Sequence, residues 1–268
     1  MRSYLYIISL FTAFSLSSCE DIIELDLVDA APQVVIVADI NDISLEHEIS
    51  VFNSIPISQE LGNSAVENAS VSIVSLADNR EYIFNYQGKG IYKNRGFHPE
   101  VGGKYALTVR IADKQFDAVS TMQPYVEIDS LNLKSKTIFD EDRIFVTFSF
   151  KDPANELNFY KYSLARNSQP LKFAAIYNDK FNDGRNIQHD ITDADDDIVE
   201  GDDITIIRTS VDEQVYNYWA DLRSLNPGSL APANPRTNLS NGALGYFSVG
   251  AAKKYIIRNV AINRNSND

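Results

Sequence analysis

The acidic segment Asp190–Asp203 is the stretch of this chain with the most residues that could bind a metal ion. Asp193, Asp195 and Asp197 have the spacing of positions 1, 3 and 5 of a calcium-binding loop. Such a loop needs glycine at position 6 and glutamate at position 12, and this chain has isoleucine at both. The segment is therefore not an EF-hand. We predict no cofactor and a solvated acidic loop, with calcium in an irregular site as the alternative.

The second chemical feature is Cys19, the single cysteine of the chain. It follows a leader, residues 1–18, in which Arg2 supplies a positive charge and Tyr4–Leu16 is a largely apolar stretch of 13 residues. That stretch is too short to cross a bilayer of about 30 Å as a helix. The sequence Leu16-Ser17-Ser18-Cys19 resembles the site at which bacterial lipoproteins are acylated and cleaved. We therefore predict a signal peptide, lipidation of Cys19 and a lipid anchor in the membrane.

The search for catalytic motifs is negative. His47, His98 and His189 are scattered along the chain and lack the spacing of a zinc site. No Gly-x-Ser-x-Gly elbow and no glycine-rich phosphate loop occurs. A pair of carboxylates of the glycosidase kind leaves no local signature. We therefore predict that the protein is not an enzyme, and a surface hydrolase is the weakest of the alternatives.

Composition narrows the class of protein further. The formal net charge is −13, and cleavage of the leader removes one positive charge, Arg2, to give −14. This charge argues against nucleic acid as a partner, because phosphates require a basic surface. Hydrophobic residues make up 44% of the chain, which has 14 tyrosines and 14 phenylalanines. These values are typical of a folded, aromatic-rich β protein.

The first half of the mature chain has the pattern of a β-sandwich. Residues 19–31 form a lipidated tether, and residues 32–124 contain about seven short segments with strand character. In Gly103–Ile111, for example, apolar and polar side chains alternate, which predicts a strand with one buried face. We expect an immunoglobulin-like or transthyretin-like sandwich that ends near residue 125.

The second half, residues 125–268, is expected to be another β-rich domain, either a sandwich or a barrel, with one amphipathic helix. The helix is predicted over residues 211–225, because Ser210 and Glu213 form a capping box ahead of an apolar stripe. Trp219 in this stripe is expected to pack the helix onto the sheet. Two strands, Ala243–Val249 and Lys254–Val260, are predicted to end the fold.

The proline-rich loop 226–242 follows the helix and leads into an aromatic strand. Proline-rich segments stay extended, and a long ordered loop in a compact domain is often functional. The alternative is a simple connection between the helix and the last strands. We name as candidate residues for binding a ligand or partner Pro227, Pro232, Asn234, Pro235, Tyr246 and Phe247.

A short motif, Asp129-Ser130-Leu131, resembles the acceptor for O-glycosylation of exported proteins in Bacteroidota. The motif is only three residues long. The start of an ordinary strand explains these residues equally well, so both interpretations stay open.

Three sequence blocks carry a resemblance to a family: Cys-Glu-Asp-Ile-Ile-Glu-Leu-Asp from Cys19, Phe-Lys-Asp-Pro from Phe150 followed by Asn-Phe-Tyr at 158–160, and the stretch from Asn226 to Phe247. Together they resemble the Bacteroidota outer-membrane lipoproteins grouped as domain of unknown function 4249. Such lipoproteins are commonly encoded beside TonB-dependent receptors. The resemblance carries over no catalytic residues.

This resemblance implies an accessory or binding subunit of a TonB-dependent nutrient uptake system. The expected partners are a TonB-dependent outer-membrane receptor and the membrane itself, through the lipid. Glu20 and Asp21 resemble a signal for export to the outer leaflet, so we expect an outer-membrane protein that faces the cell exterior. The main alternative is a structural or adhesive surface module.

Overall fold

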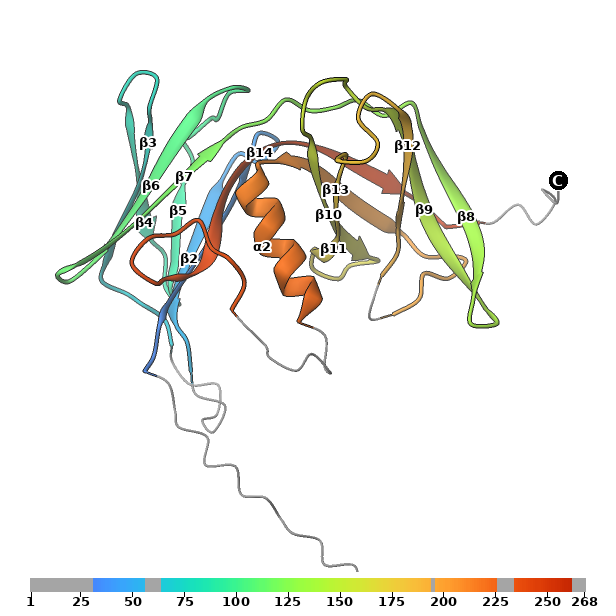
Figure 1. The fold of residues 1–268 in the computed structure, drawn as a ribbon. Coiled ribbons are helices and arrows are strands. Elements are labelled where there is room, and N and C mark those ends of the chain that lie inside the picture. Colours follow the sequence, from blue (N-terminus) through green and yellow to red (C-terminus); the bar gives the residue numbers. More distant parts are fainter. Residues whose placement is uncertain (1–30, 56–63, 194–195, 226–233, 262–268) are drawn as a thin grey trace, which may run out of the picture. The chain divides into compact units, whose positions relative to one another are not determined.

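Strands dominate this computed structural model, which describes residues 31–55, 64–193, 196–225 and 234–261 (Figure 1). The leader, Cys19, Pro227 and Pro232 lie outside these residues. The strands of the first half are β1 (Val34–Asn41), β2 (His47–Asn53), β3 (Ala69–Ser75), β4 (Glu81–Tyr86), β5 (Ile91–Asn94), β6 (Lys104–Ile111) and β7 (Lys114–Thr121). Those of the second half are β8 (Ser130–Ile138), β9 (Glu141–Lys151), β10 (Phe159–Arg166), β11 (Lys172–Asn178), β12 (Asn186–Ile191), β13 (Ile204–Val211) and β14 (Leu244–Ile257).

These strands form two sheets within the described residues. Eleven strands form one sheet in the order β11-β10-β13-β14-β1-β2-β5-β4-β3-β6-β7, and three form the other in the order β12-β9-β8. All pairings are antiparallel except that of β1 with β14, which is parallel. The prediction of a mainly β chain with an amphipathic helix is confirmed.

Strand β14 corrects the prediction of two separate final strands. Its first half, residues 244–250, pairs with β1, and its second half pairs with β13 from Ala251 to Ile257. The small residues in its middle continue the strand, because each half has a partner with which to hydrogen-bond. The same strand therefore contributes to the packing of both halves of the chain.

Three hydrophobic clusters fill the interior of the described residues, and the two larger ones divide near the boundary predicted at residue 125. The first contains buried residues from β1 to β7 together with Phe247, Val249 and Ala251 of β14. The second contains buried residues from Val126 to Val260. The smallest lies beneath α2 and contains Ile176, Val211, Val215 and Tyr246. Strand β7 also meets β14, where the Val249 amide donates to the Ser120 hydroxyl at 3.0 Å. The alternation predicted for β6 is confirmed, because Tyr105, Leu107 and Val109 are all buried in the first cluster.

Strand β12 was missed in the sequence because its residues, Asn-Ile-Gln-His-Asp-Ile, are mostly polar. It pairs with β9, and Ile187, His189 and Ile191 alternate on its buried face. Buried and exposed residues alternate along β12 as in other strands, but the central buried residue is His189 and not an apolar one. Tertiary packing outweighs intrinsic strand propensity here.

Helix α2 spans Glu213–Ser224, slightly less than predicted. Its N-cap is Asp212 and not Ser210, because β13 continues to Val211 and the Asp212 side chain accepts from the Val215 amide at 3.0 Å. The other carboxylate oxygen of Asp212 accepts from the Ser120 hydroxyl of β7 at 2.7 Å. Asp212 thus both caps α2 and connects it to the first half of the sheet.

Candidate functional site

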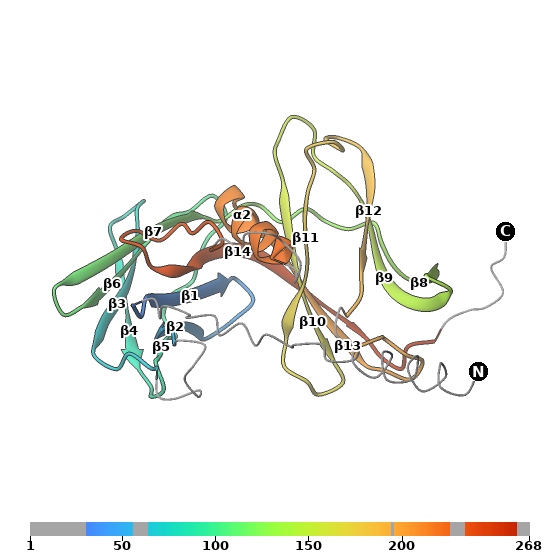
Figure 2. The same cartoon turned by 60° about the horizontal axis from the view of Figure 1, so that its bottom comes forward.

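A cavity of about 270 Å³ lies on the sheet beside α2. Figure 2 shows α2 beside the strands that contribute to it. Five adjacent strands, β1, β14, β13, β10 and β11, supply residues to its walls. In β1, β10 and β13 the lining residues are two positions apart, as expected for side chains that share one face of a sheet. The lining residues are Asp39, Asn41, Lys161, Ser163, Leu171, Lys172, Phe173, Ile207, Thr209, Trp219 and Tyr246.

Lys161 is the principal charged group of the cavity. The residue is only 2% exposed, and its ammonium forms an ion pair with Asp39 of β1. Its nitrogen lies 5.6 Å from the ring centre of Tyr246 and 5.9 Å from that of Trp219. The partial charges of these ring faces favour a nearby cation. A buried lysine is costly unless paired, so Asp39 and the two rings together hold this charge in place.

Aromatic side chains form the wall between α2 and the sheet. Trp219 stacks on Phe173 of β11 with ring centres 4.1 Å apart, and it meets Tyr246 edge-on at 5.5 Å. These contacts confirm that Trp219 packs the helix onto the sheet. Burial raises the pKa of Tyr246 well above its usual value, with a further contribution from the Asp39 carboxylate, so Tyr246 stays neutral. The indole N–H of Trp219 is buried and, among the described residues, has no hydrogen-bond acceptor.

This arrangement has the features of a site that binds a small ligand. The described lining residues include no histidine or cysteine, and Lys161 is held by Asp39. The cavity offers flat aromatic surface and an ammonium–carboxylate pair. Cavities of this kind recognise small ligands by stacking and by a few directed hydrogen bonds.

Of the residues that the sequence suggested as candidates for binding, the structure places some in the cavity and others elsewhere. Tyr246 lines the cavity, whereas Phe247, the next residue of β14, is fully buried in the first hydrophobic cluster. Asn234 is exposed and Pro235 is half-buried. Beside them, the Arg236 guanidinium donates to both carboxylate oxygens of Asp221 on α2, at 2.7 and 2.8 Å.

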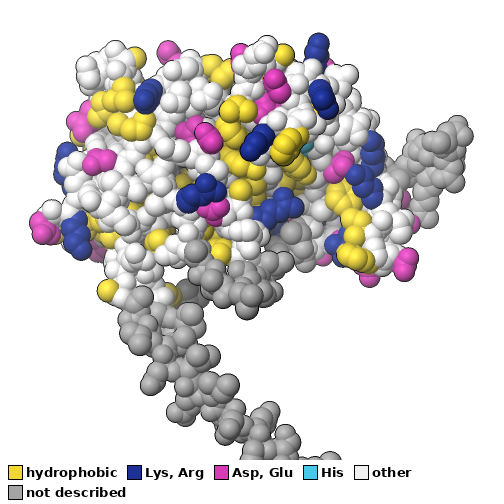
Figure 3. All heavy atoms as spheres, viewed as in Figure 1, with side chains coloured by type: hydrophobic (Ala, Val, Ile, Leu, Met, Phe, Trp, Pro, Cys, Tyr) yellow, Lys and Arg dark blue, Asp and Glu magenta, His cyan; other side chains and the backbone are white. Residues whose placement is uncertain are grey.

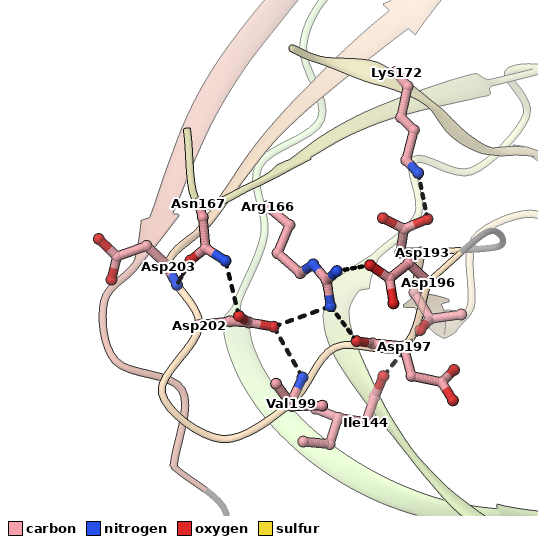
Figure 4. A network of polar contacts seen from close by, with 11 residues as sticks. Ile144, Arg166, Asn167, Lys172, Asp193, Asp196, Asp197, Val199, Asp202 and Asp203 are labelled. Carbon is pink, nitrogen blue, oxygen red and sulfur yellow. Dashed lines mark hydrogen bonds and ion pairs between the residues drawn. The ribbon is translucent and has the colours of Figure 1, made fainter. Parts of the chain in front are cut away.

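The acidic segment that suggested calcium is engaged with basic side chains (Figure 4). Asp193 accepts from Lys172 at 2.6 Å, and Asp197 lies 3.6 Å from Arg143. Arg166 contacts Asp196 and lies 3.5 Å from Asp202. Asp195 lies outside the described residues. The carboxylates that are described thus act as ion-pair partners of cations on neighbouring strands.

Figure 3 shows acidic, basic and hydrophobic side chains interspersed on the face that it draws. Ser130 of the short motif is exposed at the start of β8. The interpretation of this motif as a strand start is therefore confirmed, while glycosylation stays a prediction.

Sequence reasoning missed most of the cavity, including Lys161 and Asp39, because they are 122 positions apart and share no local pattern. It also missed a group of three carboxylates, Asp152, Asp179 and Asp183, that lie close together at the ends of β9 and β11. A signal was available for two of them: Asp179, Asp183 and Gly184 have the spacing of positions 1, 5 and 6 of a calcium loop.

The fold and the cavity define a mainly β protein with a small aromatic cavity beside a single described helix. The family model for domain of unknown function 4249 matches residues 20–256, so the chain belongs to this family. Among curated proteins, no relative matches the chain. Within the described residues, no helix has the length and apolar character needed to cross a membrane.

Proposed function

We propose that this chain is a lipid-anchored outer-membrane protein that binds a small ligand as an accessory subunit of a TonB-dependent nutrient uptake system. The cavity beside α2, with Lys161 buried among aromatic rings, is the observation that carries the binding function. The leader that ends at Cys19 supports the anchor. The proposed uptake system rests on the resemblance to lipoproteins encoded beside TonB-dependent receptors.

The chemistry of the cavity favours a ligand with hydroxyl groups and a flat apolar face, such as one sugar ring. The rings of Trp219 and Tyr246 supply apolar surface to the cavity. Lys161 and Asp39 supply a donor and an acceptor side by side. A volume of about 270 Å³ is at the lower end of the range for small-molecule sites, which limits the ligand to about one ring.

Fluorescence of the single tryptophan provides a direct test, because Trp219 lines the cavity. We expect monosaccharides, titrated one at a time into the detergent-solubilised full chain, to change the emission of Trp219 in a saturable way for at least one of them. Lys161→Met should abolish the change, since it removes the buried ammonium. Lys254→Met is the matched control, because Lys254 is exposed on β14 and does not line the cavity.

The partner is tested by mild detergent extraction of the native membrane. We expect a TonB-dependent receptor, identified by mass spectrometry, to copurify with the protein. A monomeric lipoprotein with no such receptor and no response to any sugar would favour a structural or adhesive surface module instead.

A further inference from the structure

Three aspartates meet where β9 and β11 end. Asp152 follows β9, Asp179 follows β11, and Asp183 lies in the loop between β11 and β12. One carboxylate oxygen from each lies within 4.8 Å of the others. Asp152 is 1% exposed and Asp179 is fully buried, whereas Asp183 is exposed. Two of these three acidic groups are thus withdrawn from water.

The hydrogen bonds around these carboxylates leave acceptor atoms without a partner. Asp152 accepts from the Tyr160 hydroxyl at 2.7 Å and from the Gly184 amide at 3.3 Å. Oδ2 of Asp179 accepts from the Asn158 amide at 2.9 Å, but its Oδ1 is buried and accepts nothing. The side-chain oxygen Oδ1 of Asn158, a residue only 8% exposed, is also buried without a donor. Buried acceptors are normally satisfied, so these two oxygens call for a hydrogen-bond donor or a cation.

The chain does not provide this partner from its own basic residues. Among the described side chains, no lysine or arginine lies within ion-pair distance of the three carboxylates. Two adjacent buried carboxylates repel each other unless a proton or a cation lies between them.

The loop between β11 and β12 has part of a calcium-loop pattern. Asp179, Asp183 and Gly184 match positions 1, 5 and 6, and Gly184 has φ +68°, as a sharp turn at position 6 requires. Position 3 is Phe181, which is 81% exposed and has no oxygen in its side chain. Asp152, from the end of a different strand, adds a third carboxylate within 4.8 Å of those of Asp179 and Asp183.

We propose that Asp152, Asp179 and Asp183, with the side-chain oxygen of Asn158, form a binding site for one Ca²⁺ ion. All four donors are oxygen atoms, which suits a hard cation. Calcium is favoured over magnesium because the carboxylates come from an irregular pair of loops, and Mg²⁺ demands nearly ideal octahedral geometry. The site ties the loop after β9 to the loop after β11, and it does not involve the cavity beside α2.

The test uses the full chain, freed of divalent ions by a chelator, with calcium chloride as the probe. We expect Ca²⁺ at about 100 times its Kd to raise Tm by about 5–10 °C, while Mg²⁺ at the same concentration has a much smaller effect. Titration calorimetry should give one site per chain. Asp183→Asn should weaken Ca²⁺ binding at least about tenfold, and it should fold because Asp183 is exposed.

Two further variants test whether Ca²⁺ binds at these three aspartates and not at another acidic segment. Asp197→Asn lies in the other acidic segment and should bind Ca²⁺ as the wild type does. Asp179→Asn should abolish the calcium response yet raise Tm in the presence of chelator, because it removes the repulsion from Asp152. A purely structural role for Asp179 predicts a lower Tm instead. The proposal is overturned if no Ca²⁺ binds at millimolar concentration, if Mg²⁺ binds equally well, or if Asp197→Asn rather than Asp183→Asn removes binding.

Discussion

His189 makes the stability of this protein depend on pH in a way that the structure allows us to quantify. Its Nδ1 lies 2.8 Å from the Tyr162 hydroxyl, and that same hydroxyl accepts from Nε of Arg208 at 2.9 Å. Because burial and the nearby Arg208 charge favour a neutral imidazole, the Tyr162 hydroxyl can donate to Nδ1, which then acts as the acceptor. The ring also stacks on Tyr177 with centres 4.0 Å apart. Protonation of Nδ1 would break this arrangement inside the core.

The expected magnitude follows from the pKa of His189 in the folded and unfolded chain. Burial, followed by the positive charge of Arg208, lowers this pKa from 6.5 to about 3. The unfolded chain therefore binds the proton first as the pH falls. The stability that the neutral ring provides is fully present above pH 6.5 and is lost below it, at about 1.4 kcal/mol per pH unit. Lowering the pH from 7 to 5 should thus reduce the free energy of unfolding by about 2 kcal/mol through His189 alone.

The assay is urea denaturation at pH 7 and pH 5, followed by Trp219 fluorescence. Carboxylates also titrate over this range, so the measured quantity is the loss of stability in the wild type minus the loss in His189→Gln. The glutamine can still accept from Tyr162 but does not titrate, and we expect this difference to be about 2 kcal/mol. His98→Gln is the control, because His98 is exposed, and it should lose as much stability as the wild type. Equal losses in the wild type and His189→Gln would refute the reasoning.

Three further predictions concern α2, β14 and the anchor. Asp212→Ala should lower the free energy of unfolding, measured by urea denaturation, by about 1–2 kcal/mol because it removes the cap of α2. Ser210→Ala should lower it much less. The reverse order would show that Ser210 is the cap. Gly245→Ala should lower the free energy of unfolding by about 3 kcal/mol or more. The φ angle of Gly245 is +94°, and the added Cβ would lie 2.0 Å from the Ile36 carbonyl oxygen. Gly242→Ala, also at positive φ but with free space around it, should cost about 1 kcal/mol, and equal costs would contradict the close contact with β1. Cys19→Ala should move the protein from the membrane fraction to the soluble fraction on immunoblots, and retention in the membrane would exclude the lipid anchor.

The strands of this protein were largely predictable because they depend on local pattern. The alternation of Tyr105, Leu107 and Val109 predicts both the strand β6 and its buried face, and the structure has both. The helix was predictable from its apolar stripe, but its first residue was not. Both Ser210 and Asp212 have suitable side chains for a cap, and the choice depends on how far β13 continues alongside its partners.

The sequence by itself determined that the chain is mainly β and that α2 packs through Trp219, and it predicts a leader that ends at Cys19. The tertiary structure alone decided the parallel pairing of β1 with β14, and with it the contact between Asp39 and Lys161. It also decided that Asp152 joins Asp179. The physical reason is that both contacts join segments far apart in the chain. That of Asp39 with Lys161 depends on strand register, and a one-residue shift would turn these side chains to the opposite face.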